Sequence, residues 1–211
     1  MCGIVGITSS KEVTSRIIGS LKKLEYRGYD SAGIATISEN NINEVKCEGR
    51  VNELEKNVNQ INLSGTIGIG HVRWATHGKP STINAHPHSS DNVSVVHNGI
   101  IENSTILKKI LEKKGYKFKS QTDTEVIVHL VTDYLKKNNL KDTIIKVLKK
   151  LHGSFALGII FKDQPDLIIG ARRGSPLAVG YGPDEHYLGS DSYALKSMTN
   201  KISYLNDGEF C

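Results

Sequence analysis

Short, apolar and β-branched stretches gather at the start, the middle and the end of this 211-residue chain, with longer amphipathic stretches between them. The short stretches predict strands, and the longer ones, with apolar residues at i, i+3 and i+4, predict helices. Strands that cluster between helical blocks favour an α+β layered arrangement over a regular βαβ repeat. No internal repeat and no linker rich in Pro, Gly and Ser divides the sequence, so we expect one domain over residues 1–211.

The expected elements follow one another in blocks. Strands are predicted at 1–8, 31–38, 42–47, 66–74, 93–97, 154–161, 167–171, 177–179 and 186–189. Helices are predicted at 12–24, 104–114, 124–137 and 142–151, with one or two further turns at 193–198. Residues 74–92 are polar and predict a long loop.

Charge and targeting signals exclude several function classes. The formal net charge is +5, but the lysines form short runs such as 108–109 and 149–150, which are typical of solvated helix faces. Arginines and aromatic residues do not alternate as they do in nucleic-acid-binding segments, so we expect no nucleic-acid partner. The N-terminus has no basic region before an apolar one, and no apolar run reaches the roughly 20 residues of a membrane span. We therefore expect no membrane association.

The cysteines and histidines argue against a metal centre. Cys2, Cys47 and Cys211 are odd in number and widely spaced, which disfavours a disulfide framework and a CxxC metal site. His86 and His88 flank Pro87, but no acidic or cysteine cluster accompanies them, so we expect no metal. Unpaired cysteines fit a reducing compartment, and the expected location is the cytoplasm.

Cys2 is the first candidate for chemistry. Removal of Met1 leaves its thiol and a free α-amine on one carbon framework, with reference pKa values of about 8.5 and about 7.7 to 8.0, so the amine is suited to act as a built-in base. Two alternatives stay open. A cysteine that begins a buried strand is more often a small core residue. If Met1 is retained, the base is missing, and the domain is expected to be a catalytically silent interaction domain.

Four further residues suggest an amino-acid-binding acyl-transfer site. Asn98 and Gly99, at the predicted end of a strand, supply an amide side chain and a close backbone N–H as oxyanion donors. Arg73 follows a strand and can grip a carboxylate bidentately, while Asp123 can bind an ammonium group. Taken singly, these residues are more commonly explained by a turn, a surface ion pair and a helix cap or first-turn position. Spacing alone does not choose between these explanations.

Six stretches, however, occur in the order found in the class II glutamine amidotransferases, which this chain resembles along nearly its whole length. They are MCGIVGI, LEYRGYDSAGIA, GIGHVRWATHG, AHPH, VVHNGIIEN and QTDTEVI. The resemblance implies an N-terminal-nucleophile fold, a four-layer αββα sandwich. It also implies that Cys2 attacks the side-chain amide of L-glutamine, and that Asn98 and Gly99 stabilise the oxyanion.

The same resemblance assigns the substrate contacts. Arg73 is implied to bind the carboxylate of glutamine and Asp123 its ammonium group, with Thr76 and His77 at the carboxylate end. Trp74, the sole tryptophan, is implied to lie on a mobile loop that closes over glutamine, although an isolated tryptophan is otherwise a core anchor. No cofactor is implied.

Two motif forms point to a branch of the family. YRGYDSAG and HVRWATHG resemble the members that act with fructose 6-phosphate, whereas the phosphoribosyl branch usually has RGQ in the first motif and tyrosine in place of Trp74. This implies that sugar-isomerase domains of the same parent chain, absent from residues 1–211, bind fructose 6-phosphate and that the parent is a homo-oligomer. Asp30 and Ser31 are expected to support the strand that carries Cys2. A phosphoribosyl-type acceptor remains the alternative.

Overall fold

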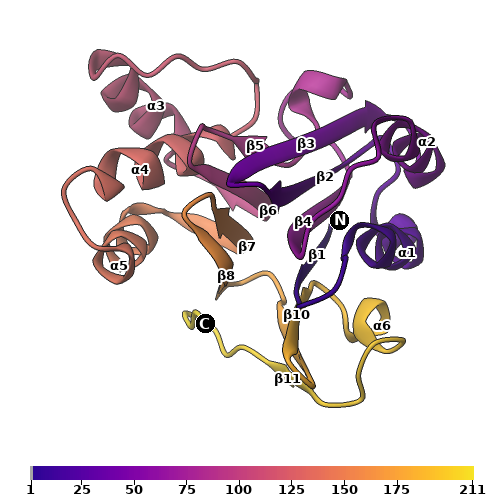
Figure 1. The fold of residues 1–211 in the computed structure, drawn as a ribbon. Coiled ribbons are helices and arrows are strands. Elements are labelled where there is room, and N and C mark those ends of the chain that lie inside the picture. The colour runs from indigo at the N-terminus through magenta and orange to yellow at the C-terminus, as the bar shows by residue number, and fades with distance from the viewer. Residues whose placement is uncertain (1) are drawn as a thin grey trace.

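Two antiparallel sheets lie face to face in the computed structural model, which describes residues 2–211; Met1, whose removal the proposed chemistry requires, lies outside the described residues. Helices α1, α2 and α6 pack on the larger sheet, and α3, α4 and α5 pack on the smaller one (Figure 1). The order of layers is helices, sheet, sheet, helices. This arrangement confirms the expected α+β sandwich.

The larger sheet has the strand order β11-β9-β10-β1-β4-β2-β3, and the smaller has β5-β6-β7-β8. The strands are β1 Gly3–Thr8, β2 Ser31–Ser38, β3 Asn41–Glu48, β4 Ile67–Arg73, β5 His88–Ser89, β6 Val93–Ile101, β7 Gly153–Phe161, β8 Gln164–Arg173, β9 Ala178–Gly182, β10 Glu185–Gly189 and β11 Ile202–Tyr204. The helices are α1 Thr14–Leu24, α2 Val51–Ile61, α3 Ser104–Lys113, α4 Glu125–Leu135, α5 Leu140–Lys150 and α6 Ser192–Leu195, with 3-10 turns at Glu25–Arg27 and Thr82–Asn84.

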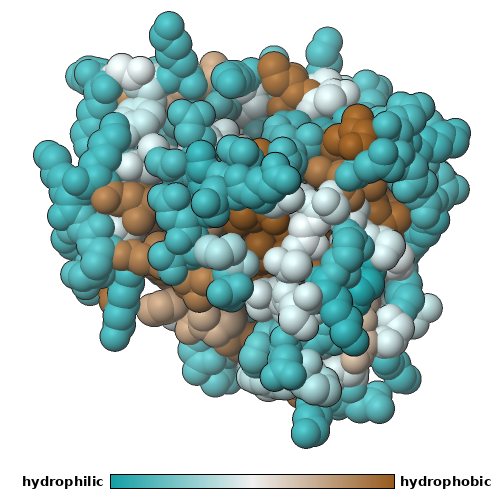
Figure 2. All heavy atoms as spheres, in the orientation of Figure 1, coloured by the Kyte–Doolittle hydropathy of each residue, from teal (hydrophilic) through white to brown (hydrophobic). Residues whose placement is uncertain are grey.

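The two sheets share an apolar layer in the middle of the molecule. Ile4 of β1 and Ile69 of β4 meet Val96 of β6 and Ile160 of β7 there, and all four side chains are buried. Figure 2 shows a mostly hydrophilic surface on one face, with hydrophobic side chains visible near its centre. Strand β1 begins directly after Cys2, and strand β4 ends directly before Trp74. Both strands are thus fixed by packing on both of their faces. No helix in residues 2–211 has the length and apolar character needed to cross a bilayer.

Helix α2 was not predicted from the sequence. Val51, Leu54 and Val58 form its buried stripe, but the intervening residues are polar and the N-cap residue Arg50 makes no side-chain cap. The backbone N–H of Val51 instead donates to Glu25 Oε1 at 2.7 Å, from 26 positions earlier in the chain. Because a distant residue satisfies the helix start, no local capping pattern marks it.

The polar-loop prediction for residues 74–92 is wrong for the second half of that segment. Asn84, His86 and His88 are buried, and β5 begins at His88. Their polar groups have partners: Asn84 Nδ2 donates to Gln121 Oε1 at 3.1 Å, and His86 Nε2 lies 2.7 Å from Thr124 Oγ1. Hydrogen bonds of this kind allow polar side chains to be buried, and hydropathy does not reveal them.

Candidate active site

A small cavity of about 20 Å³, room for about one water molecule, lies where the start of β1, the end of β4, the middle of β6 and the approach to α4 meet. Every predicted site residue except Asn98 lines it. The lining residues are Cys2, Arg73, Trp74, Thr76, His77, His86, His97, Gly99, Thr122, Asp123 and Thr124. The sequence motifs therefore converge on one place in the fold.

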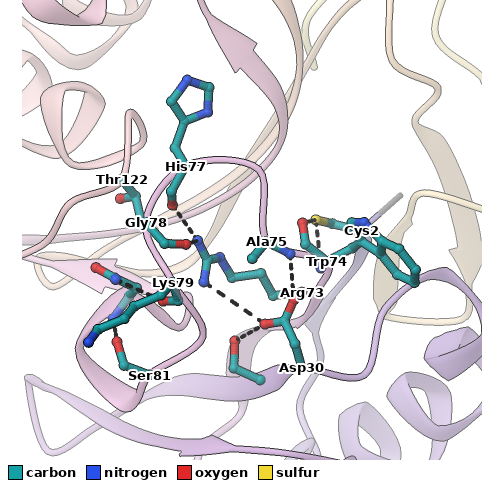
Figure 3. Close-up of polar contacts among 12 residues, drawn as sticks. Cys2, Asp30, Arg73, Trp74, Ala75, His77, Gly78, Lys79, Ser81 and Thr122 are labelled. Atoms are coloured by element: carbon teal, nitrogen blue, oxygen red, sulfur yellow. Dashed lines mark hydrogen bonds and ion pairs between the residues drawn. The ribbon is translucent and has the colours of Figure 1, made fainter.

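Cys2 lies directly before β1, with its thiol against the backbone of Trp74. The Trp74 N–H donates to Sγ at 3.2 Å, and the Trp74 carbonyl oxygen lies 3.4 Å from Sγ (Figure 3). The Cys2 carbonyl oxygen accepts from Arg27 Nε at 3.0 Å. Burial raises the pKa of the Cys2 thiol above its ordinary value, and the hydrogen bond from the Trp74 N–H offsets only part of this rise. A partner that accepts the thiol proton is therefore needed before attack near neutral pH.

Asn98 and Gly99 lie within β6, not at a strand end as the sequence pattern indicated. Asn98 Nδ2 donates to the carbonyl oxygen of Cys2 at 3.0 Å, so the amide reaches the nucleophile's own backbone. Gly99 has φ +130°, and a Cβ built there would lie 2.0 Å from the carbonyl oxygen of Ser154. Only glycine fits this position.

The guanidinium of Arg73 is buried and binds the loop that follows β4. Its Nη2 donates to the carbonyl oxygens of His77 and Gly78, the latter at 3.0 Å (Figure 3). Its Nη1 has no hydrogen-bonding partner among residues 2–211 and lies 3.9 Å from Asp30 Oδ1. A buried donor without a partner is unfavourable, so this group is suited to receive an additional acceptor such as a carboxylate.

Asp30 holds the start of the same loop. Its Oδ2 accepts from the N–H of Ala75 (Figure 3), and its Oδ1 accepts from Ser31 Oγ at 2.9 Å. The expectation that Asp30 and Ser31 support the Cys2 strand is therefore wrong, because their hydrogen bonds hold the loop that follows β4. Arg27, through its bond to the Cys2 carbonyl, supports the strand instead.

Trp74 is half-exposed at the rim of the cavity. The residue is 49% exposed, and its ring meets Tyr29 edge-on with 5.7 Å between centroids. The alternative of a core anchor is wrong, because a core anchor would be buried. Beside it, His77 Nδ1 lies 3.4 Å from Thr76 Oγ1.

Asp123 is buried and also lines the cavity. Its Oδ2 accepts from the backbone N–H of Ile101 at 2.7 Å, which fixes the carboxylate relative to β6. Asp123 does not cap α4, because the residue at the N-cap position is Thr124. The carboxylate is thus anchored through one oxygen while it lines the cavity.

Buried histidines are the part of the site that the sequence did not reveal. His71, His86, His88 and His97 are all buried, and burial lowers the pKa of each; it falls to about 3 for His71 and His88. These rings are therefore neutral at neutral pH. Among residues 2–211, no group of three or more His, Cys, Asp or Glu side chains is arranged to hold a metal ion.

Glu125, the first residue of α4, organises the loop that carries Asp123. Burial alone raises the pKa of Glu125, but the His129 imidazole at 3.5 Å and hydrogen bonds from Ser120 and Lys119 outweigh burial and lower it to about 2. A carboxylate with a depressed folded-state pKa stabilises the fold above its unfolded-state pKa. The contribution is on the order of 3 kcal/mol.

We therefore expect Glu125→Gln to lower the free energy of unfolding at pH 7, and the deficit relative to wild type to shrink as the pH falls from about 4.5 towards about 2. Urea unfolding at a series of pH values measures this difference. Glu112→Gln, at an exposed position of α3, is the matched control and should follow the wild-type curve. A deficit for Glu125→Gln that is independent of pH would contradict the assignment.

Comparison with known proteins defines the class. A family model described as a glutamine amidotransferase domain matches residues 72–197, more than half of the chain. The chain belongs to this family of glutamine amidotransferase domains. A glutamine–fructose-6-phosphate aminotransferase (isomerizing) of Bradyrhizobium diazoefficiens is 53% identical over 211 residues, and one of Clostridium acetobutylicum is 52% identical over 212. Each alignment covers 100% of this chain and 35% of the relative, so the chain spans about a third of those proteins.

A solved structure agrees with the fold. The glutamine phosphoribosylpyrophosphate amidotransferase of B. subtilis aligns with a TM-score of 0.82 and 30% identity, over 99% of this chain and 46% of that chain. The shared architecture supports the αββα sandwich.

Proposed function

We propose that this chain hydrolyses the side-chain amide of L-glutamine to glutamate and ammonia, with Cys2 as the nucleophile. The observation that carries the proposal is the convergence of Cys2, Gly99, Arg73 and Asp123 around one cavity, with the Asn98 amide bound to the carbonyl oxygen of Cys2. A nucleophile, amide and backbone donors, a cation and an anion are together what acyl transfer from an α-amino acid requires. No cofactor enters this chemistry.

In the first step the Cys2 sulfur bonds to the amide carbon, and the thiol proton passes to the α-amine that removal of Met1 exposes. The oxyanion that forms lies within reach of Asn98 Nδ2 and the Gly99 N–H. Collapse breaks the C–N bond, and the α-ammonium returns its proton to the departing ammonia. Water then hydrolyses the γ-glutamyl thioester and regenerates the thiol.

Glutamine binding requires the loop after β4 to move. The cavity holds about one water molecule, and the carbonyl oxygens of His77 and Gly78 occupy Arg73 Nη2. The substrate carboxylate would replace these carbonyls on the guanidinium, and its ammonium group would meet Asp123. Trp74, half-exposed on the same loop, would then cover the bound glutamine, with Thr76 and His77 at its carboxylate end.

The proposal extends to the parent protein. The fructose-6-phosphate aminotransferase relatives are about three times as long as this chain, which supports residues 1–211 as one glutaminase domain that supplies ammonia to sugar-isomerase domains for glucosamine 6-phosphate formation. Unpaired thiols at Cys2, Cys47 and Cys211 are consistent with a cytoplasmic location. Homo-oligomerisation of the parent is a prediction that sedimentation of the full-length protein tests.

The deciding experiment compares two forms of the chain, one beginning at Cys2 and one that retains Met1. We expect the first form to release ammonia from L-glutamine and not from L-asparagine. The second form, in which the nitrogen of Cys2 is part of a peptide bond, should be at least about 100-fold slower. A γ-electrophilic glutamine analogue should add one adduct, which peptide mapping locates on Cys2 and not on the free thiols Cys47 and Cys211. An adduct elsewhere, or equal rates for both forms, would exclude the mechanism.

A further inference from the structure

The neutral histidines form a continuous cluster next to the oxyanion donors. The rings of His71 and His86 stack with centroids 4.3 Å apart, and His86 meets His88 at 4.7 Å. His86 Nε2 and His97 Nδ1 both contact Thr124 Oγ1, at 2.7 Å and 2.9 Å. None of these rings accepts or donates a proton in the mechanism above. Their hydrogen bonds instead determine how neighbouring groups are oriented.

His71 is the ring that contacts a donor used in the chemistry. Its Nε2 lies 3.0 Å from the His97 carbonyl oxygen and 3.0 Å from Asn98 Oδ1. Both of these atoms are acceptors, so Nε2 must carry the hydrogen. Its Nδ1 is buried and has no hydrogen-bonding partner in the described part of the chain, which a lone pair tolerates better than an N–H. Since burial also keeps the ring neutral, one tautomer, with hydrogen on Nε2, satisfies every contact.

The tautomer fixes the direction of the Asn98 amide. With Oδ1 bound to His71, Nδ2 points to Cys2 and donates to its carbonyl oxygen at 3.0 Å. A flipped amide would set its NH₂ against the His71 N–H and its oxygen against the Cys2 carbonyl oxygen. Both contacts would be lost and replaced by repulsion. Because His71 belongs to β4 and Asn98 to β6, the amide is set from the opposite sheet.

We propose that His71 is the positioning residue of the oxyanion site: its Nε2–H holds the Asn98 amide with the NH₂ group directed at the backbone carbonyl oxygen of Cys2. This inference rests on the proposed glutamine hydrolysis. It predicts that the place of the donor on side chain 71, and not the imidazole itself, matters for the chemical step.

A pair of amide variants separates these requirements. His71→Gln places an amide nitrogen near the position of Nε2, whereas His71→Asn places it near Nδ1, out of reach of Asn98. We expect His71→Asn to lower kcat for glutamine hydrolysis by about 10-fold to 100-fold with little change in KM, and His71→Gln to recover most of that loss. His88→Asn, the same change in a ring whose hydrogen bond goes to Thr122, controls for general damage to the cluster. Equal losses in all three variants would overturn the proposal.

A double-mutant cycle tests the route of the effect. If His71 acts through Asn98, the double variant His71→Asn with Asn98→Ala should be no slower than Asn98→Ala alone. Losses that multiply would show that His71 acts elsewhere and would overturn the inference. Thermal unfolding of each variant identifies any that fail to fold. If His71→Asn fails to fold, His71→Gln takes its place in the cycle, and whatever change in kcat it causes must vanish in the Asn98→Ala background.

Nuclear magnetic resonance of ¹⁵N-histidine-labelled protein reads the tautomer without activity. The signals of His71, assigned by their absence in His71→Gln, should report a neutral ring with hydrogen on Nε2 throughout pH 5 to 8. Hydrogen on Nδ1 would overturn the proposal. Wild-type protein that releases no ammonia would refute the proposed function instead, and the tautomer would still decide whether His71 orients Asn98.

Discussion

Replacement of Cys2 by alanine is expected to abolish ammonia release from L-glutamine while L-glutamine binding persists. The substitution removes the sulfur that bonds to the amide carbon but leaves the Arg73 guanidinium and the Asp123 carboxylate in place. Loss of a nucleophile typically lowers kcat by about 10⁴-fold to 10⁶-fold, because without the attack of sulfur no oxyanion forms for the remaining donors to stabilise. A coupled ammonia assay and titration calorimetry measure the two properties.

The chain contains its own control for this substitution. Cys47 is a buried thiol on β3 whose Sγ contacts the Arg50 carbonyl oxygen at 3.9 Å, and it does not line the cavity. Cys47→Ala should therefore leave kcat near the wild-type value, with at most a small loss of stability. If Cys2→Ala retained more than about 1% of the wild-type rate, a loss far below that of removing a nucleophile, Cys2 would not be the nucleophile.

The outlines of the site could be predicted because its polar residues lie in recognisable motifs. Cys2, Arg73 and Asp123 were singled out as residue types with the right chemistry, and the resemblance ordered them into one site. The structure brings them to one cavity. Their roles in catalysis and binding remain predictions that the experiments above test.

The contacts that hold these residues could not be predicted. His71 and Asn98 are 27 positions apart on strands of different sheets, so their hydrogen bond depends on how the sheets pack. Arg73 was assigned a substrate carboxylate as its partner, yet in the structure it binds the backbone carbonyls of His77 and Gly78, a group that every residue type carries. Contacts made by the backbone leave no signature in residue type.

The secondary structure also divides into elements that could be predicted from the sequence and elements that could not. Apolar strands and helices with a clear period were located to within a few residues, as at Ser31–Ser38, which matches the buried strand β2. Helix α2 was missed because Glu25 provides the cap from a distant position. Strand β11 was missed because Ile202–Tyr204 is short and mostly exposed, so it carries no alternation of buried and exposed residues.

Gly99→Ala is expected to impair folding and hydrolysis together. At φ +130° an L-residue is strained, and the added Cβ would lie 2.0 Å from the Ser154 carbonyl oxygen on the neighbouring strand β7. Strain and overpacking together should lower the free energy of unfolding by about 3 kcal/mol or more. Relief of the clash must move the backbone of β6 and with it the Gly99 N–H, so kcat should fall by about 100-fold, as for loss of one oxyanion donor.

Gly115→Ala shows the effect of backbone strain alone, without the steric clash that an added Cβ causes at position 99. Gly115 also has a positive φ, +91°, but a Cβ there would meet no atom within 4 Å. We expect this variant to lose only about 1 kcal/mol of stability and to keep the wild-type kcat. Urea unfolding and the ammonia assay compare the two. Equal destabilisation by both substitutions would mean that strand β7 yields to the added methyl group. In that case the requirement for glycine at position 99 would come from backbone conformation alone, and the kcat of Gly99→Ala would decide whether its N–H takes part in the reaction.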